Sequence, residues 1–137
     1  MGNFGIGNTF GRETMEWNNG QKRIWREIRH RYPAGGLFTS EVLTANAGKV
    51  IPAGTPVKLD QATKTLTILS GSESDLAVDG FTQEDVWVKD GVEAASATVI
   101  YAGELYEPVF KAAICGGDAT KLAAFKAAAP KGVVFVR

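Results

Sequence analysis

The feature that most constrains this chain is a run of alternating, mostly apolar residues from Ala97 to Phe110. Successive side chains of a strand point to opposite faces. One face then carries Ala97, Val99, Tyr101 and Leu105, and the other carries Ile100, Ala102 and Tyr106. Because both faces are largely apolar, the rest of the protein or a neighbouring subunit should cover the strand on both sides.

Composition places the chain among single globular domains. Its 137 residues are 45% hydrophobic and 22% charged, which is ordinary for a domain that folds without a disulfide or metal. The single cysteine, Cys115, excludes an internal disulfide and is expected to be a small buried residue. We expect neither a secretion signal nor a membrane span, because no apolar run approaches the roughly 20 residues that a span needs.

The first 36 residues predict an N-terminal arm on a β-rich domain of residues 37–137. Residues 1–20 are rich in Gly and Asn, and such a segment can hardly bury a core of its own. Residues 21–32 predict a short basic amphipathic helix that ends before Pro33, and residues 33–36 predict a hinge. The apolar stripe of that helix would consist of Ile24, Trp25, Ile28 and Tyr32.

The charge of the chain is unevenly divided although it sums to zero. Residues 1–32 hold six Lys or Arg and three Asp or Glu, whereas residues 33–137 hold nine and twelve. A basic arm on a mildly acidic domain can join subunits head to tail or bind another acidic partner.

Beyond residue 36, alternation and turn residues predict a series of short strands. They cover residues 38–43, 49–51, 57–59, 65–68, 76–78, 86–88, 97–106 and 133–136. Gly54 should lie in a turn, and Asp90-Gly91 predicts a hairpin that joins residues 86–88 to Val92. Asp118 should cap one helix over residues 119–129.

The predicted class is therefore α+β and predominantly β. We expect a small sandwich or barrel-like body with one C-terminal helix and an extended N-terminal arm.

The sequence shows no catalytic signature. Nucleophilic catalysis needs a base beside the nucleophile, and the only histidine, His30, lies in the predicted arm. Metal sites need clustered ligands, and the carboxylates near predicted turns fit no calcium loop. We expect no enzyme activity, no catalytic residue, no metal and no cofactor.

The arm leaves three interpretations open. Its helix can pack on its own domain and leave the arginines in solvent. It can instead dock into a partner, which we favour because Trp, Tyr and Arg dominate interface energies. The third interpretation is a small nucleic-acid-binding accessory protein that uses residues 22–31; five phosphate contacts would give a slope of log K against log salt of roughly −4.5. The residues expected to bind a partner are Trp17, Arg23, Trp25, Arg26, Arg29, Arg31 and Tyr32.

Several short motifs over residues 45–110 resemble the capsid decoration and head-fibre proteins of tailed bacteriophages. The first is Gly48-Lys-Val-Ile-Pro-Ala-Gly-Thr-Pro-Val-Lys-Leu-Asp60. It is followed by Gly80-Phe81, by Val86-Trp-Val88-Lys-Asp-Gly91 and by Ala97-Thr-Val-Ile-Tyr-Ala-Gly-Glu-Leu-Tyr106. No fibrous extension follows, so the chain is most similar to a compact decoration protein or to the capsid-attached base of a fibre.

This resemblance implies a virion protein on the outer face of the capsid, made in the host cytoplasm. Such proteins are commonly homotrimers that bind the major capsid protein and stabilise the head. We also expect no membrane partner, and the zero net charge of the chain argues against nucleic acid as a partner.

Overall fold

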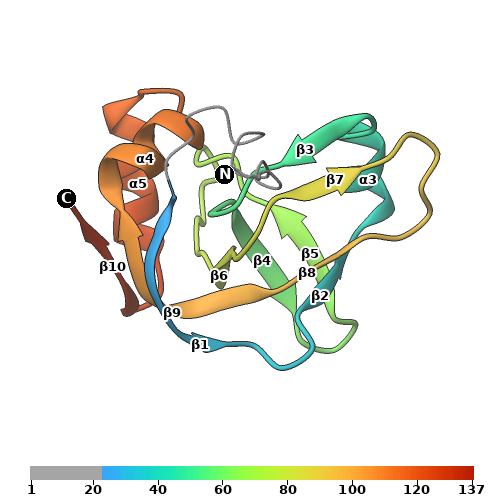
Figure 1. Ribbon diagram of the computed structural model, residues 1–137, viewed down its shortest axis with the longest axis horizontal. Coiled ribbons are helices and arrows are strands. Elements are labelled where there is room, and N and C mark those ends of the chain that lie inside the picture. The colour runs from blue at the N-terminus through green and yellow to red at the C-terminus, as the bar shows by residue number, and fades with distance from the viewer. Residues whose placement is uncertain (1–22) are drawn as a thin grey trace, which may run out of the picture.

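The computed structural model describes residues 23–137 (Figure 1). Its strands are β1 (Trp25–Arg31), β2 (Gly36–Phe38), β3 (Lys49–Ile51), β4 (Pro56–Asp60), β5 (Thr65–Ile68), β6 (Gly80–Thr82), β7 (Val86–Val88), β8 (Ser96–Ala97), β9 (Val99–Tyr106) and β10 (Gly132–Val136). Its helices are α3 (Ser40–Ala45), α4 (Glu107–Ala113) and α5 (Ala119–Ala128). The predicted class, a predominantly β protein with C-terminal helix, is confirmed.

The main sheet curls into a barrel-like body. Its strand order is β1-β9-β6-β4-β5-β2-β8, and β10 also pairs with β9. Only Thr98 separates β8 from β9, yet these two strands lie far apart along the sheet order. The sheet therefore curls until β2 and β6 both meet the same stretch of chain, residues 96–106 (Figure 1).

The central strand β9 is covered on both faces, as predicted, although Leu105, which the alternation placed with Val99, belongs to the same cluster as Ile100. Val99, Ile100 and Leu105 are fully buried. Val99 belongs to a cluster shared with β2, β4, β5 and α3, whereas Ile100 and Leu105 belong to a second cluster beside α4 and α5. The same chain supplies both covers, so β9 needs no neighbouring subunit to be buried.

Phenylalanine rings hold the two C-terminal helices against the sheet. The ring of Phe110 in α4 packs edge-on against Phe81, Phe125 and Phe135, with centroids 5.6, 5.9 and 5.2 Å away. Such pairs stabilise by about 0.5–1.5 kcal/mol each beyond the area they bury. Figure 1 shows α4 and α5 together on one side of the barrel, next to β10.

The helix predicted for residues 21–32 is wrong in the described part, because residues 25–31 form β1. This strand pairs antiparallel with β9, and its register shifts after Trp25 and around His30. Such shifts are bulges, at which two residues oppose one and the strict alternation of side chains fails. Trp25 and Ile28 consequently pack against the same core cluster although they are three residues apart, and this spacing imitated a helical stripe.

The residues predicted as a hinge form a packed turn. Ala34 and Gly35 have φ angles of 64° and 56°. A Cβ at Gly35 would lie 2.1 Å from the carbonyl oxygen of Ala97, so the turn has no room for a side chain there. Residues 25–31 and 36–38 thus belong to the sheet and the packed turn joins them, so only residues 1–22 lie outside the described structure.

Two other predicted strands and one hairpin are wrong. The strand predicted over 38–43 ends at Phe38, because Thr39 caps α3 by accepting a hydrogen bond of 3.3 Å from the Val42 amide. Residues 76–78 form no strand. β7 pairs with β3 instead of with Val92, although Gly91 does turn the chain with φ 82°.

Other local predictions are confirmed. β4 and β5 form the predicted hairpin, and Gly54 has the expected positive φ of 84°. Asp118 caps α5 by accepting a hydrogen bond of 2.9 Å from the Thr120 amide. The additional helix α4 was not predicted; it begins at Glu107, where the chain leaves β9.

Because Trp25 is a core residue, removing β1 should unfold the protein. We expect Trp25→Ala to lower the free energy of unfolding by about 3–5 kcal/mol. Deletion of residues 1–32 should abolish the thermal transition, whereas deletion of residues 1–22 should preserve it. The measurement is circular dichroism during heating, with the exposed Lys89→Ala as control; a cooperative transition in the 1–32 deletion would contradict the role of β1.

Candidate interaction surface around β1

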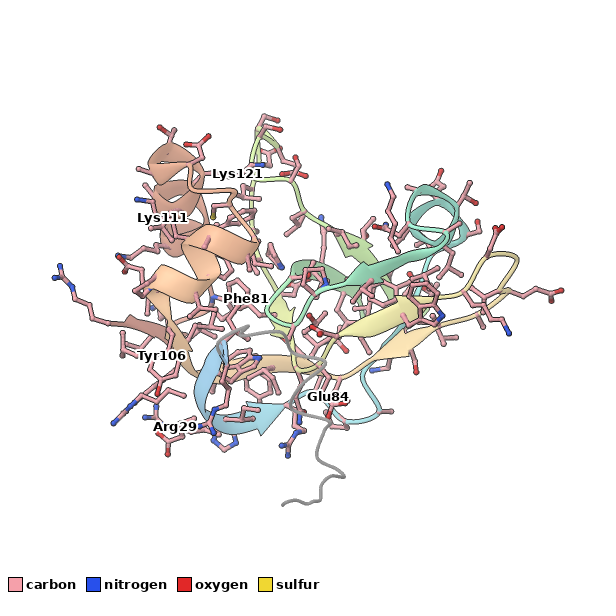
Figure 2. All side chains as sticks on the ribbon, turned by 45° about the horizontal axis from the view of Figure 1, so that its top comes forward. Arg29, Phe81, Glu84, Tyr106, Lys111 and Lys121 are labelled. Carbon is pink, nitrogen blue, oxygen red and sulfur yellow. The ribbon has the colours of Figure 1, made fainter. Side chains whose placement is uncertain are left out.

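The exposed face of β1 is a ladder of mixed charges. The carboxylate of Glu104 on β9 pairs with Arg26 and also with Arg29, whose Nη2 lies 2.9 Å from Glu104 Oε2. The same Arg29 nitrogen lies 3.1 Å from Glu27 Oε1. The hydrogen bond and the negative charge of Glu104 hold the pKa of Arg26 above its ordinary value. Figure 2 shows Arg29 at the outer surface of the molecule.

These ion pairs reduce the positive charge that the arginines can offer to nucleic acid. Glu104 accepts from two of the five cations on which the nucleic-acid interpretation depends. The described residues also hold as many basic as acidic side chains, because Arg12 and Lys22 balance Glu13 and Glu16 in residues 1–22. The uneven charge seen in the sequence was therefore a property of β1 and of Arg23 just before it, and not of a separate arm.

An aromatic patch continues the face of β1. The ring of His30 stacks on Tyr101 with centroids 5.8 Å apart, and Tyr101 also packs against Tyr32 at 4.7 Å. The Tyr32 hydroxyl donates a hydrogen bond of 3.3 Å to the Asp79 carbonyl, and burial raises the pKa of that hydroxyl. Beside them, Arg31 Nε donates to Gln83 Oε1 at 3.2 Å.

The side chain of Arg23 donates hydrogen bonds to backbone carbonyls at the start of β1. Arg23 Nε donates a hydrogen bond of 2.7 Å to the Trp25 carbonyl, and Arg23 Nη2 donates one of 3.1 Å to the Arg26 carbonyl. β1 is the last strand at this end of the sheet order, so these carbonyls lie on its outer edge. An edge strand presents such groups to any chain that can pair with it.

The seven residues predicted to bind a partner do not form one surface. Arg23, Arg26, Arg29 and Arg31 are exposed along β1 and its approach, and Tyr32 is half-buried. Trp25 is only 5% exposed, and its Nε1 donates to the Thr82 carbonyl at 3.0 Å. The structure therefore places Trp25 in the core, not on a docking surface. Trp17 lies outside the described residues.

A groove of about 1200 Å³ runs beside the start of β1. Its apolar lining includes Ile24, just before β1, together with Ile28 of β1 and Val109 of α4. Charged residues such as Arg26 and Asp85 also line it, and Asp85 Oδ1 accepts a hydrogen bond of 2.8 Å from the Ala53 amide. An apolar lining with a few charged groups is typical of a binding groove. Sequence reasoning missed it because α4 was not predicted.

A second exposed apolar patch lies on the ribbon formed by β3 and β7. Trp87 is 59% exposed and lies directly opposite Val50, which is 47% exposed. The alternation of Val86, Trp87 and Val88 already indicated an exposed tryptophan, because the two valines pack toward the protein and the residue between them does not.

Within residues 23–137, the side chains that could bind a metal ion are dispersed. No group of three or more His, Cys, Asp or Glu side chains among them is placed to hold a metal ion. None of the helices in this part of the chain is long and apolar enough to cross a membrane. Cys115 is buried, as predicted, and burial raises the pKa of its thiol.

No protein-family model matches the chain, and no curated protein matches it. The resemblance of residues 45–110 to phage decoration proteins therefore remains a prediction.

The raised pKa of the Cys115 thiol gives a test of its burial. In the folded protein at pH 8 the thiol should react with a disulfide reagent at least about tenfold more slowly than after unfolding, because the thiolate is the nucleophile. The unfolded state ionises first as the pH rises, so the contribution of Cys115 to stability should decrease above its unfolded pKa, near 8.5. Equal reaction rates in the folded and unfolded protein would contradict this assignment.

Proposed function

We propose that this chain is a structural virion protein that binds the outer surface of a bacteriophage capsid and stabilises the head. The observation that carries the proposal is the set of motifs over residues 48–106, which resembles that family. These motifs build the turn before β4 and the central strand β9. The proposed role needs a rigid body with accessible edges and faces, and it needs no reactive centre.

The surface around β1 supplies residue types suited to protein contacts. Arg29 and Arg31 are exposed and flank in sequence His30, which stacks on Tyr101, at the end of the sheet that the N-terminal segment joins. Arginine and tyrosine contribute heavily to interfaces because they combine contact area with several hydrogen bonds. We assign this face, with residues 1–22, to the contact with the major capsid protein.

In this proposal the segment of residues 1–22 reaches a neighbouring capsid subunit. A chain rich in Gly and Asn can follow a surface that a rigid domain cannot, although its ordering costs part of the binding free energy. A homotrimer would present three such segments, and each bound segment raises the effective concentration of the others. The patch of Trp87 and Val50 offers a further apolar contact for a subunit or for the capsid.

The test is co-sedimentation with heads of the encoding phage that lack this protein. Arg29→Ala should weaken binding by roughly thirtyfold, which corresponds to about 2 kcal/mol, the loss typical of one interfacial arginine. Lys64→Ala, in the remote turn between β4 and β5, should bind as the unaltered chain does.

Deletion of residues 1–22 should reduce binding further while the thermal transition persists. Unchanged binding by this deletion would remove the N-terminal segment from the interface. If the unaltered chain does not sediment with the heads at any salt concentration, the capsid assignment itself is wrong.

A further inference from the structure

The outer edge of β1 and the groove beside it face the point where residues 1–22 join the described structure. Arg23, the first described residue, itself lines the groove. Trp17 is six residues earlier, and six residues span at most about 20 Å. A segment this short is held near the groove at a high effective concentration, so the chain's own N-terminal segment is the favoured occupant.

The sequence just before β1 contains a strong turn signal. Asn19-Gly20 is the dipeptide most typical of a two-residue β-hairpin turn, because both positions tolerate positive φ. A turn at these two residues pairs Asn18 with Gln21 and fixes the register of everything before it. Glu16 then lies opposite Arg23, Met15 opposite Ile24 and Thr14 opposite Trp25.

The backbone of β1 has the polarity that this register requires. In a two-residue hairpin, hydrogen-bonded pairs alternate with non-hydrogen-bonded pairs. In this register Arg23 and Trp25 belong to hydrogen-bonded pairs, so their backbone amide and carbonyl groups must point away from β9. The Ile24 carbonyl points inward, to the Tyr106 amide of β9 at 2.8 Å. The Trp25 carbonyl does point outward, where only the side chain of Arg23 now donates to it among the described residues.

The side chains also match. Cross-strand partners lie on the same face of a hairpin, so in this register Met15 and Trp17 would share the face of Ile24. Ile24 packs against the turn at Gly54, where a Cβ would come within 2.5 Å of its Cδ1, and the neighbouring Ala53 lines the groove. On the other face Glu16 would lie opposite Arg23, and opposite charges in such a pair are stabilising.

We propose that residues 14–18 of the same chain add to the outer edge of β1 as an antiparallel strand and cover the adjoining groove with Met15 and Trp17. The Thr14 amide takes the place of Arg23 as donor to the Trp25 carbonyl. The released Arg23 guanidinium pairs with Glu16. The segment is therefore anchored at its root, and residues 1–13 are the part that extends toward a partner.

This inference does not rest on the capsid role, because its test uses the free, full-length protein. Met15 and Ile24 form a non-hydrogen-bonded pair, whose Cα atoms are about 4.5 Å apart. NMR should show a nuclear Overhauser effect between their α protons. The Trp25 amide, which would donate to the Thr14 carbonyl, should exchange slowly with solvent.

The matched variants are Gly20→Val and Gly7→Val. Valine at residue 20 disfavours the turn, so the Overhauser effect should disappear and the Trp25 amide should exchange at least about tenfold faster, while the body stays folded. Valine at residue 7 lies outside the pairing and should change neither signal. Absence of the Overhauser effect in the unaltered chain, or Trp25 exchange that Gly20→Val does not alter, would overturn the proposal.

A mixture of isotope-labelled and unlabelled protein identifies the donor of the strand. An Overhauser effect confined to one molecule supports the assignment. If the effect appears between labelled and unlabelled molecules, the strand comes from a second copy and the assignment to the same chain is wrong.

Discussion

The burial of β9 on both faces is the constraint on which the rest of this structure depends. Fully burying a residue such as Val99, Ile100 or Leu105 stabilises by about 1.5–3 kcal/mol relative to exposure. A strand buried in this way must also satisfy its backbone along both edges. β1 pairs along one edge, while β6 and β10 divide the other, so one eight-residue strand organises three neighbours.

Close backbone approach at glycines makes this arrangement possible. A Cβ at Gly103 would lie 2.5 Å from the Glu27 carbonyl of β1, and one at Gly80 would lie 2.7 Å from the Ile100 carbonyl. The position of β1 on β9 therefore requires glycine at residue 103, and the position of β6 requires it at residue 80. The groove follows from the same strand, because α4 starts where β9 ends and carries Val109 past β1.

Sequence reasoning succeeded where the signal was local and failed where pairing was distant. The β4–β5 hairpin, the turn at Gly54 and the cap of α5 by Asp118 depend on residues that are close in sequence. The pairing of β7 does not depend on nearby residues: Asp90-Gly91 turned the chain, but β7 pairs with the distant strand β3. For β1, bulges replaced the alternation of a strand with a spacing that also fits a helix.

The same distinction applies to the candidate surface. Its arginines could be named from composition, since exposed arginine on a terminal segment is a common interface residue. Their acceptor could not, because Glu104 is 75 to 78 residues away in the sequence and reaches Arg26 and Arg29 only through strand pairing. Trp25 shows the opposite error: a residue type enriched at interfaces proved to be a core residue once its indole met the Thr82 carbonyl.

The exposed edge of β1 has two physically different halves. From Arg26 to Arg31, charged side chains and irregular register disfavour the addition of another strand, a common protection of sheet edges. Before the bulge, the Trp25 carbonyl still points outward, and within residues 23–137 only the side chain of Arg23 donates a hydrogen bond to it. Strand addition is therefore confined to the start of β1, and the arginine face beyond it can contact a partner only through side chains. Since both halves belong to one strand fixed on β9, a segment anchored at the first half would be held at a constant distance from any partner bound at the second.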